Sequence, residues 1–241
     1  MEERELANVV EQQHFFESVP APSSEGNEGT RDMEPLYPFL ISGGSNTERY
    51  YFAHICDITN YKFNIKPEYF GDESNYTEMF PNRIKGILNT NTDPKIFCVF
   101  DWDTIYENDA KIKKHEDFEK LFQTEIDNGN VVICPSMPSI DYWFLLHFEN
   151  YTGLIKSCGK KMCKLLSPHM TQYFPSANKK IIRLLKQKKY IEKPDWVKNL
   201  CSDGKLDTAI KRAEDNIKAA EDSGDLKNQS YSYVYKVFNK A

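Results

Sequence analysis

The sequence has no apolar run that approaches the ~20 consecutive residues needed to cross a lipid bilayer. Charged residues make up 28% of its 241 positions and the mean hydropathy is −0.63, which argues against an integral membrane protein. The opening Met-Glu-Glu-Arg-Glu also lacks the basic flank and apolar centre of a secretory signal. We therefore expect a cytoplasmic protein that has no membrane partner.

Cysteine is scarce, and its spacing indicates no disulfide framework. Two of the six cysteines, Cys98 and Cys134, lie in apolar stretches, where a thiol behaves as a small hydrophobe, so we expect reduced thiols. Cys158, Cys163 and His169 only superficially resemble a zinc site, because a fourth ligand and a short C-x2-C pair are missing. The chain also has no GxxxxGK[ST] phosphate loop, so nucleotide hydrolysis by this chain is not expected.

Hydrophobic residues (40%) and aromatic residues (13%) are abundant enough for a substantial core. Residues 1–34 include a stretch rich in Pro, Ser, Gly and Glu, and we interpret them as a flexible N-terminal tail. Residues 35–150 read as an α/β domain. Residues 151–241 read as a basic helical lobe that completes the same unit.

Strand and helix patterns alternate between residues 35 and 150, which predicts a central parallel sheet flanked by helices. The predicted strands are 37–42, 62–66, 95–100 and 130–134. The predicted helices between them are 47–56, 76–88, 116–127 and 140–148, with Asn46 or Thr47 capping the first. After residue 151 we find no strand and predict helices at 181–189, 206–220 and 231–240.

Positive charge is concentrated in one segment. Residues 156–198 contain twelve Lys and Arg against two acids, a local net charge of +10 in a chain whose net charge is −5. The remaining residues therefore carry −15. This asymmetry predicts a basic face beside an acidic site, although a solvated helix surface rich in lysine is an equally good interpretation.

Acidic residues follow the predicted strands, at the sheet edge where parallel α/β proteins place their sites. Glu48 follows the first strand, Asp101 and Asp103 follow the third, and Asp141 follows the fourth. Carboxylates this close repel one another, and a hard cation such as Mg²⁺ or Mn²⁺ relieves the repulsion. Metal held in this way can activate water and neutralise a phosphodiester, with lysine from the basic segment nearby.

These residues resemble those of RloB-like proteins, a TOPRIM-related group. Ile41-Ser-Gly-Gly-Ser-Asn-Thr-Glu-Arg-Tyr-Tyr-Phe52 resembles the family's opening "EGxxTExxYF", and Val99-Phe-Asp-Trp-Asp103 resembles its "VFDxD". Ser136-Met-Pro-Ser-Ile-Asp-Tyr-Trp-Phe-Leu-Leu-His-Phe-Glu149 is similar to "SNPxFELWLLLHFE". Tyr173-Phe-Pro-Ser-Ala-Asn-Lys179 resembles a "Y-x-K" segment, and Thr208-Ala-Ile-Lys-Arg-Ala213 and Ser232-Tyr-Val-Tyr-Lys-Val237 resemble the closing helices. The resemblance covers about residue 35 to the C-terminus.

The resemblance implies a TOPRIM-like (Rossmann-like) fold and a metal-dependent nuclease in bacterial anti-phage, or abortive-infection, defence. It implies Mg²⁺ or Mn²⁺ ligands at four acids: Asp101, Asp103, Glu48, which is similar to the second glutamate of "EGxTE" in overcoming-lysogenization-defect nucleases, and Asp141, which stands where the family has Glu. Lys179 matches the lysine at the phosphate. We expect nucleic acid (DNA or RNA, including tRNA) to bind at Lys179, Lys180, Arg183 and Lys186, and an AAA or ABC-type ATPase as partner.

The sequence departs from the family pattern at three informative positions. Gly43 replaces the first glutamate, which is expected to bind metal or act as acid or base, and glycine offers no carboxylate. Ala177 replaces the tyrosine before the lysine, and Met137 replaces the asparagine of "SN". Loss of a general base lowers a rate by roughly 10²–10⁴-fold. This copy could thus be slow, recruit Glu48 or another acid, or be inactive.

Three functions remain open. The first is a nuclease that depends on Mg²⁺ or Mn²⁺. The second is a catalytically degenerate TOPRIM scaffold that binds nucleic acid or an ATPase, which Gly43 favours. The third is another phosphotransfer or primase-like reaction on the same fold, since a fold does not fix a reaction. We expect His147 to be a core histidine, Trp102 to pack or stack on a base, and Tyr231–Tyr235 to form part of a packed terminal helix.

Overall fold

The computed structural model describes residues 37–44, 46–66, 76–174 and 180–239. The predicted tail at 1–34, Lys179 and Ala177 lie outside these residues. Within the described residues, the central element is one five-stranded sheet in the order β2-β1-β3-β4-β5. The strands are β1 (Phe39–Ser42), β2 (Asn64–Lys66), β3 (Ile96–Asp101), β4 (Val131–Met137) and β5 (Tyr231–Ser232). The first four are parallel and β5 runs antiparallel to β4. The predicted α/β class with a mostly parallel sheet is confirmed.

β1 lies between β2 and β3, so the chain leaves β1 toward one side of the sheet and returns to the other side for β3. Helices α2 (Thr47–Ile58) and α3 (Tyr76–Thr90) make these two crossings on opposite faces of the sheet. The carboxyl ends of β1 and β3 therefore have no crossing helix between them. Open α/β sheets bind their ligands at such a switch point.

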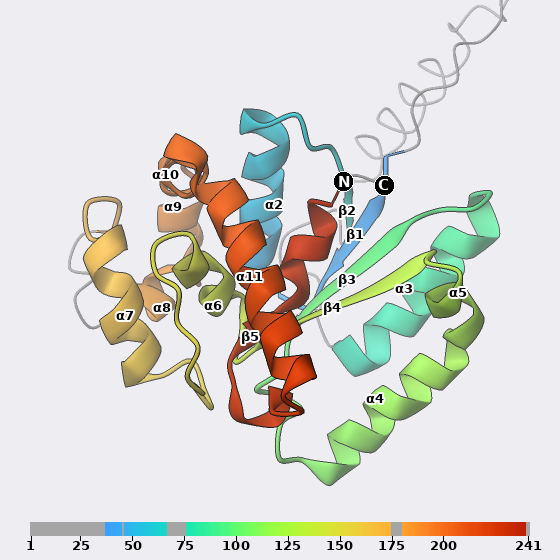
Figure 1. The fold of residues 1–241 in the computed structure, drawn as a ribbon. Coiled ribbons are helices and arrows are strands. Elements are labelled where there is room, and N and C mark those ends of the chain that lie inside the picture. Colours follow the sequence, from blue (N-terminus) through green and yellow to red (C-terminus); the bar gives the residue numbers. More distant parts are fainter. Residues whose placement is uncertain (1–36, 45, 67–75, 175–179, 240–241) are drawn as a thin grey trace, which may run out of the picture. The chain divides into compact units, whose positions relative to one another are not determined.

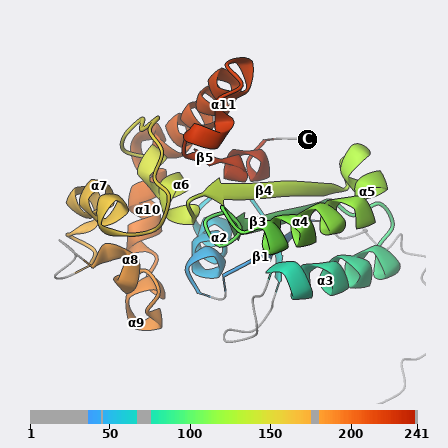
Figure 2. The same cartoon turned by 90° about the horizontal axis from the view of Figure 1, so that it is seen from below.

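β1 and β3 are buried on both faces, which explains their continuous apolar sequences. Leu40 and Val99 point to one face, where they pack with α2, α6 (Ile140–Leu146) and α11 (Lys205–Asp222). Ile41 and Cys98 point to the other face, which α3, α4 (Asp109–Leu121) and the short α5 (Gln123–Asp127) cover. Figures 1 and 2 show α3 and α4 on one side of the sheet and α11 on the other.

The segment after α6 is helical and packs on the same core as the sheet. It contains α7 (Lys160–Met170), α8 (Ile181–Leu184), α9 (Lys188–Ile191), α10 (Asp195–Cys201), η2 (Ser202–Gly204), α11, η3 (Leu226–Asn228) and η4 (Tyr233–Val237). Met162 of α7 and Trp196 of α10 are fully buried beside side chains of α2 and α6. The predicted lobe and the α/β part therefore share one hydrophobic cluster. None of the helices in the described part of the chain combines the length and apolar character of a membrane span.

Several predicted elements differ from the structure. The predicted helix 231–240 is wrong, because β5 adds an antiparallel edge strand and the chain continues only as the 3-10 helix η4. The buried Ser232 hydroxyl lies 2.7 Å from that of Ser136 in β4, a pairing that a helix would break. The predicted helix 181–189 is interrupted and forms α8 and α9. The predicted helix 116–127 starts earlier, at Asp109, where the Asn108 side chain accepts the Lys111 N–H.

One buried hydrogen bond joins α2 to α6 across the core. The Trp143 indole N–H donates to the Tyr51 hydroxyl at 2.8 Å, and both side chains are fully buried. We expect Tyr51→Phe to lower the free energy of unfolding by about 1–3 kcal/mol, because the indole N–H loses its acceptor. Urea unfolding measures this loss. The half-exposed Tyr37→Phe is the matched control, and an equal loss in that variant would contradict our explanation.

Candidate functional site

A pocket of about 230 Å³ lies at the carboxyl ends of β1 and β3, at the switch point of the sheet. Three carboxylates from three different elements line it: Glu48, Asp101 and Asp141. Among the described residues, Lys186 is the one cation in its lining. The remaining lining residues are Gly44, Asn46, Thr47 and Ile140. Asp103, Lys180 and Arg183 are not among the lining residues, and Lys179 lies outside the described part of the chain.

Glu48 reaches the pocket from the first turn of α2, and its side chain is 5% exposed. Its carboxylate lies directly over Gly44. A Cβ atom on residue 44 would come within 1.8 Å of Glu48 Oε2. Because only glycine leaves this space open, Gly44 is what allows the Glu48 carboxylate to lie at the end of β1.

Gly43 is in close contact with β3. Its N–H donates to the Val99 carbonyl at 2.7 Å, which continues the strand pairing one residue beyond β1. A Cβ atom at position 43 would lie 3.0 Å from the Phe100 Cβ, so the neighbouring strand would have to shift to accept any side chain. The structure thus gives a local packing reason for glycine where the family pattern has glutamate.

Asp101 ends β3 and is partly buried. Its Oδ1 accepts the backbone N–H of Ile140 at 2.9 Å. The following backbone stays alongside the end of β4, since Trp102 N–H donates to the Ser136 carbonyl and Asp103 N–H to the Pro138 carbonyl, both at 2.9 Å. This pairing holds the two aspartates of the predicted pair at the same sheet edge.

Asp141 enters from the first turn of α6 and is 5% exposed. Its two carboxylate oxygens have different environments. Oδ2 accepts from the Ser139 hydroxyl at 2.9 Å and from the Cys158 thiol at 3.1 Å. Oδ1 is buried and has no hydrogen-bond partner among the described residues. Asp103 connects to the same region, because its Oδ2 accepts the Cys158 N–H at 3.4 Å.

Lys186 follows α8 and is held beside Glu48 by residues at the start of α2. The Thr47 hydroxyl donates to the Leu185 carbonyl at 2.7 Å, and the Asn46 amide donates to the Lys186 carbonyl at 3.5 Å. The predicted side-chain cap of α2 is therefore wrong: neither polar side chain caps the helix, and both bind the segment after α8. From the sequence, Lys186 was predicted only as one of several nucleic-acid contacts. Its place at the pocket depends on the bond between Thr47 and Leu185, which are 138 positions apart, and no local pattern indicates such a bond.

Burial and mutual repulsion raise the pKa values of the acids. Burial raises the pKa of Glu48 to about 7, and the nearby charge of Asp141 adds to the rise. Burial, together with the charges of Glu48 and Asp141, raises the pKa of Asp101 well above its usual range. The pKa of Asp141 is also raised by burial, against hydrogen bonds from Cys158 and Ser139. The positive charge of Lys186 works in the opposite direction on Glu48, Asp103 and Asp141.

The donor set fits a hard divalent cation. In this conformation no group of three His, Cys, Asp or Glu side chains among the described residues is placed to hold a metal ion. The chemistry nevertheless agrees with Mg²⁺ or Mn²⁺, because carboxylate oxygens from three elements line one pocket. The buried Asp141 Oδ1 also has no partner in the part of the chain that the structure describes, and a buried carboxylate oxygen in that state is costly. Glu48, Asp101 and Asp141 are the residues that would hold such an ion.

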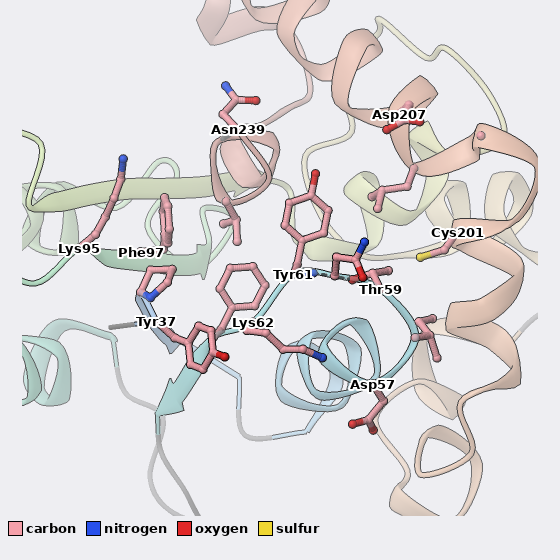
Figure 3. A pocket seen from close by; sticks show the side chains of 17 residues that line it. Tyr37, Asp57, Thr59, Tyr61, Lys62, Lys95, Phe97, Cys201, Asp207 and Asn239 are labelled. Carbon is pink, nitrogen blue, oxygen red and sulfur yellow. Dashed lines mark hydrogen bonds between the residues drawn. The ribbon is translucent and has the colours of Figure 1, made fainter. Parts of the chain in front are cut away.

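A larger pocket of about 920 Å³ lies at the opposite, amino ends of β1 and β3 (Figure 3). Tyr61, Phe97, Lys62 and Lys95 are among its lining residues. None of the predicted site residues that the structure describes lines it. Lys62 donates a hydrogen bond to the Cys56 carbonyl, so this charge is already engaged. We base the candidate site on the smaller pocket because only that pocket gathers the acids of the sheet edge.

Other residues singled out from the sequence pack in the core or pair with neighbouring side chains. Trp102 packs against His115, with ring centroids 4.8 Å apart, on the face covered by α3 and α4. His147 is 2% exposed, and burial lowers its pKa to about 3, in keeping with a core histidine. His169 pairs with Glu149 at 2.8 Å, whereas Cys158 contacts Asp141, so these two residues of the zinc-like spacing have different partners.

Fold and site together define an α/β protein with an acidic pocket and one lysine at the switch point of a mostly parallel sheet. The sequence model of the RloB-like protein family matches residues 39–240. The chain therefore belongs to the RloB-like family. A search of curated proteins found no match, and a search of solved structures found none either.

The raised pKa of Glu48 predicts how stability depends on pH. The folded state holds the proton more tightly than the unfolded state, where the pKa is about 4.5, so stability is lost as pH rises from about 4.5 to about 7. A shift of this size corresponds to at most about 3 kcal/mol. We expect Glu48→Gln, which cannot ionise, to be more stable than the wild type at pH 8 and similar to it at pH 4.5.

Urea unfolding in EDTA at both pH values tests this expectation. Glu116→Gln, on the exposed side of α4, is the matched control and should follow the wild type. Part of the decline should remain in Glu48→Gln, because Asp101 and Asp141 also have raised pKa values. If the free energy of unfolding fell as much with pH in Glu48→Gln as in the wild type, Glu48 would not be the source of the decline.

Proposed function

We propose that this chain is a TOPRIM-type nuclease that cuts phosphodiester bonds of nucleic acid and depends on Mg²⁺ or Mn²⁺. One observation carries the proposal: Glu48, Asp101 and Asp141 line a single small pocket with Lys186 at the switch point of the sheet. Clustered carboxylates with raised pKa values are typical of sites built for metal and phosphate rather than for stability.

A bound divalent ion would supply positive charge for the phosphate and make water a better nucleophile. Glu48, Asp101 and Asp141 would hold it, with Asp103 beside them through its contact with Cys158. Lys186, which Thr47 and Asn46 keep in place, would orient a phosphate oxygen and offset its charge. The role of Lys179 at the phosphate stays a prediction from the resemblance, because Lys179 lies outside the described residues.

Nucleic acid would reach the pocket along the basic segment. The exposed cations on and around α8 are Lys180, Arg183 and Lys186. Directly after α8, the chain contacts the start of α2. Exposed cations attract a phosphate backbone without regard to base sequence, and this attraction weakens with salt. The family resemblance further supports a role in cytoplasmic anti-phage defence, under control of an AAA or ABC-type ATPase.

A second function has one observation in its favour. Gly43 supplies no carboxylate, and the close approach of Phe100 leaves little space for one. A catalytically degenerate scaffold that binds nucleic acid or the ATPase would keep this packing and would have no use for metal. Such a scaffold would bind nucleic acid equally well in EDTA and would not cleave it in the presence of any metal.

The nuclease proposal predicts that Asp101→Asn loses Mn²⁺ binding and cleavage together, since one ligand oxygen becomes an amide. Calorimetry with Mn²⁺ and a panel of labelled DNA and RNA, including tRNA, measures the two properties on the same protein. Asp109→Asn, an exposed residue in the first turn of α4, is the control and should behave as wild type. Cleavage retained by Asp101→Asn would overturn the proposal, and binding of nucleic acid without cleavage would favour the scaffold.

The arrangement of glycines gives a separate prediction. Gly44→Ala should displace the Glu48 carboxylate, because the new Cβ would overlap it. We expect Mn²⁺ affinity to fall by roughly 10- to 100-fold, the range seen when support for a metal ligand is disturbed. The melting temperature should change little, since the displaced group is the end of a flexible side chain.

Gly86→Ala in α3 is the matched control, because a Cβ there meets no atom within 4 Å. Calorimetry and thermal melts of both variants separate a local effect on the pocket from a general loss of structure. Unchanged Mn²⁺ affinity in Gly44→Ala would show that Glu48 is not a ligand.

A further inference from the structure

Cys158 lies in the loop between α6 and α7, two residues before α7 begins (Figure 1). No sequence pattern connected it with the acids. In the structure its thiol donates to Asp141 Oδ2 at 3.1 Å and also contacts the Ser139 hydroxyl. Its backbone N–H donates to Asp103 Oδ2 at 3.4 Å. One residue therefore contacts two of the four acids at the sheet edge.

These contacts give the Asp141 carboxylate a defined orientation. Within residues 37–44, 46–66, 76–174 and 180–239, Oδ2 has two donors, Ser139 and Cys158, whereas the buried Oδ1 has none. A carboxylate held through one oxygen keeps the other available for a ligand. Hydrogen bonds that orient a ligand in this way commonly contribute 10- to 100-fold to metal affinity.

The loop that carries Cys158 is anchored at two further points. The Ile155 N–H donates to the buried Ser230 hydroxyl at 2.9 Å, close to β5. Lys156 forms an exposed ion pair with Glu107, which follows β3, also at 2.9 Å. The loop is thus attached both to the edge of the sheet and to the segment that carries the aspartate pair, so Cys158 has a fixed position relative to the acids.

We propose that Cys158 is a positioning residue that fixes Asp141 by its thiol and Asp103 by its main-chain N–H, and so prepares the acidic pocket for a divalent cation. The inference rests on the proposed metal site and adds a residue that the family motifs do not include. It also gives the segment before the basic helix α7 a direct effect on the acids. The thiol acts as a hydrogen-bond donor and does not bind the cation.

Mn²⁺ calorimetry on the full chain tests the role of the donor. Cys158→Ala removes the thiol, and we expect Mn²⁺ affinity to fall by roughly 10- to 100-fold. Cys158→Ser keeps a donor at the same place and should stay within about threefold of the wild type. Cys163→Ala and Cys163→Ser are the matched controls, because Cys163 lies in α7 and packs against the hydrophobic core.

Thermal melts show whether each variant is folded, and Cys158→Val, which fills the space with an apolar side chain that has no hydrogen-bond donor, replaces the alanine variant if that one unfolds. Wild-type affinity in a folded Cys158→Ala or Cys158→Val overturns this inference and leaves the metal site standing. A Cys158→Ser variant as weak as Cys158→Ala overturns it as well, because donation would not be the cause. Failure of the wild type to bind Mn²⁺ overturns the metal site and this inference together.

Discussion

Three carboxylates share one small pocket, and the energy required to bury their charges together is the constraint on which the rest of the structure depends. Glu48, Asp101 and Asp141 come from α2, β3 and α6, so the pocket exists only when the sheet and both helices are assembled. Burial and repulsion raise the pKa values of all three. Buried acids with raised pKa values are concentrated at functional sites.

The surrounding residues accommodate the three buried carboxylates in different ways. Gly44 leaves space for the Glu48 carboxylate, and the Ile140 N–H binds one oxygen of Asp101. Cys158 and Ser139 bind one oxygen of Asp141, and Lys186 brings a positive charge. These contacts reduce the repulsion without removing it, since the pKa values remain raised. The remaining cost is what a divalent cation would relieve, which links the electrostatics of the pocket to the proposed function.

Local patterns predicted the parts of the fold that local physics determines. Three of the four parallel strands were predicted because they are short apolar runs, and the second was predicted from the alternation in residues 62–66. Their shared edge followed from parallel pairing. The edge strand β5 was missed because its two residues are defined only by their partners in β4. Glu48, Asp101 and Asp141 could be placed at one edge from their order after the strands. The nearness of Lys186 and Cys158 could not, because it arises from contacts between distant parts of the chain.

The bond from Thr47 to the Leu185 carbonyl has a consequence for protein synthesis. A nascent chain that ends before residue 186 already contains Glu48, Asp101, Asp103 and Asp141, yet it lacks Lys186, the cation that the described residues place at the pocket. The α10 and α11 side chains that bury one face of the sheet are absent from such a chain as well. The pocket is therefore completed late during translation, and a truncated product carries the acids without the cation.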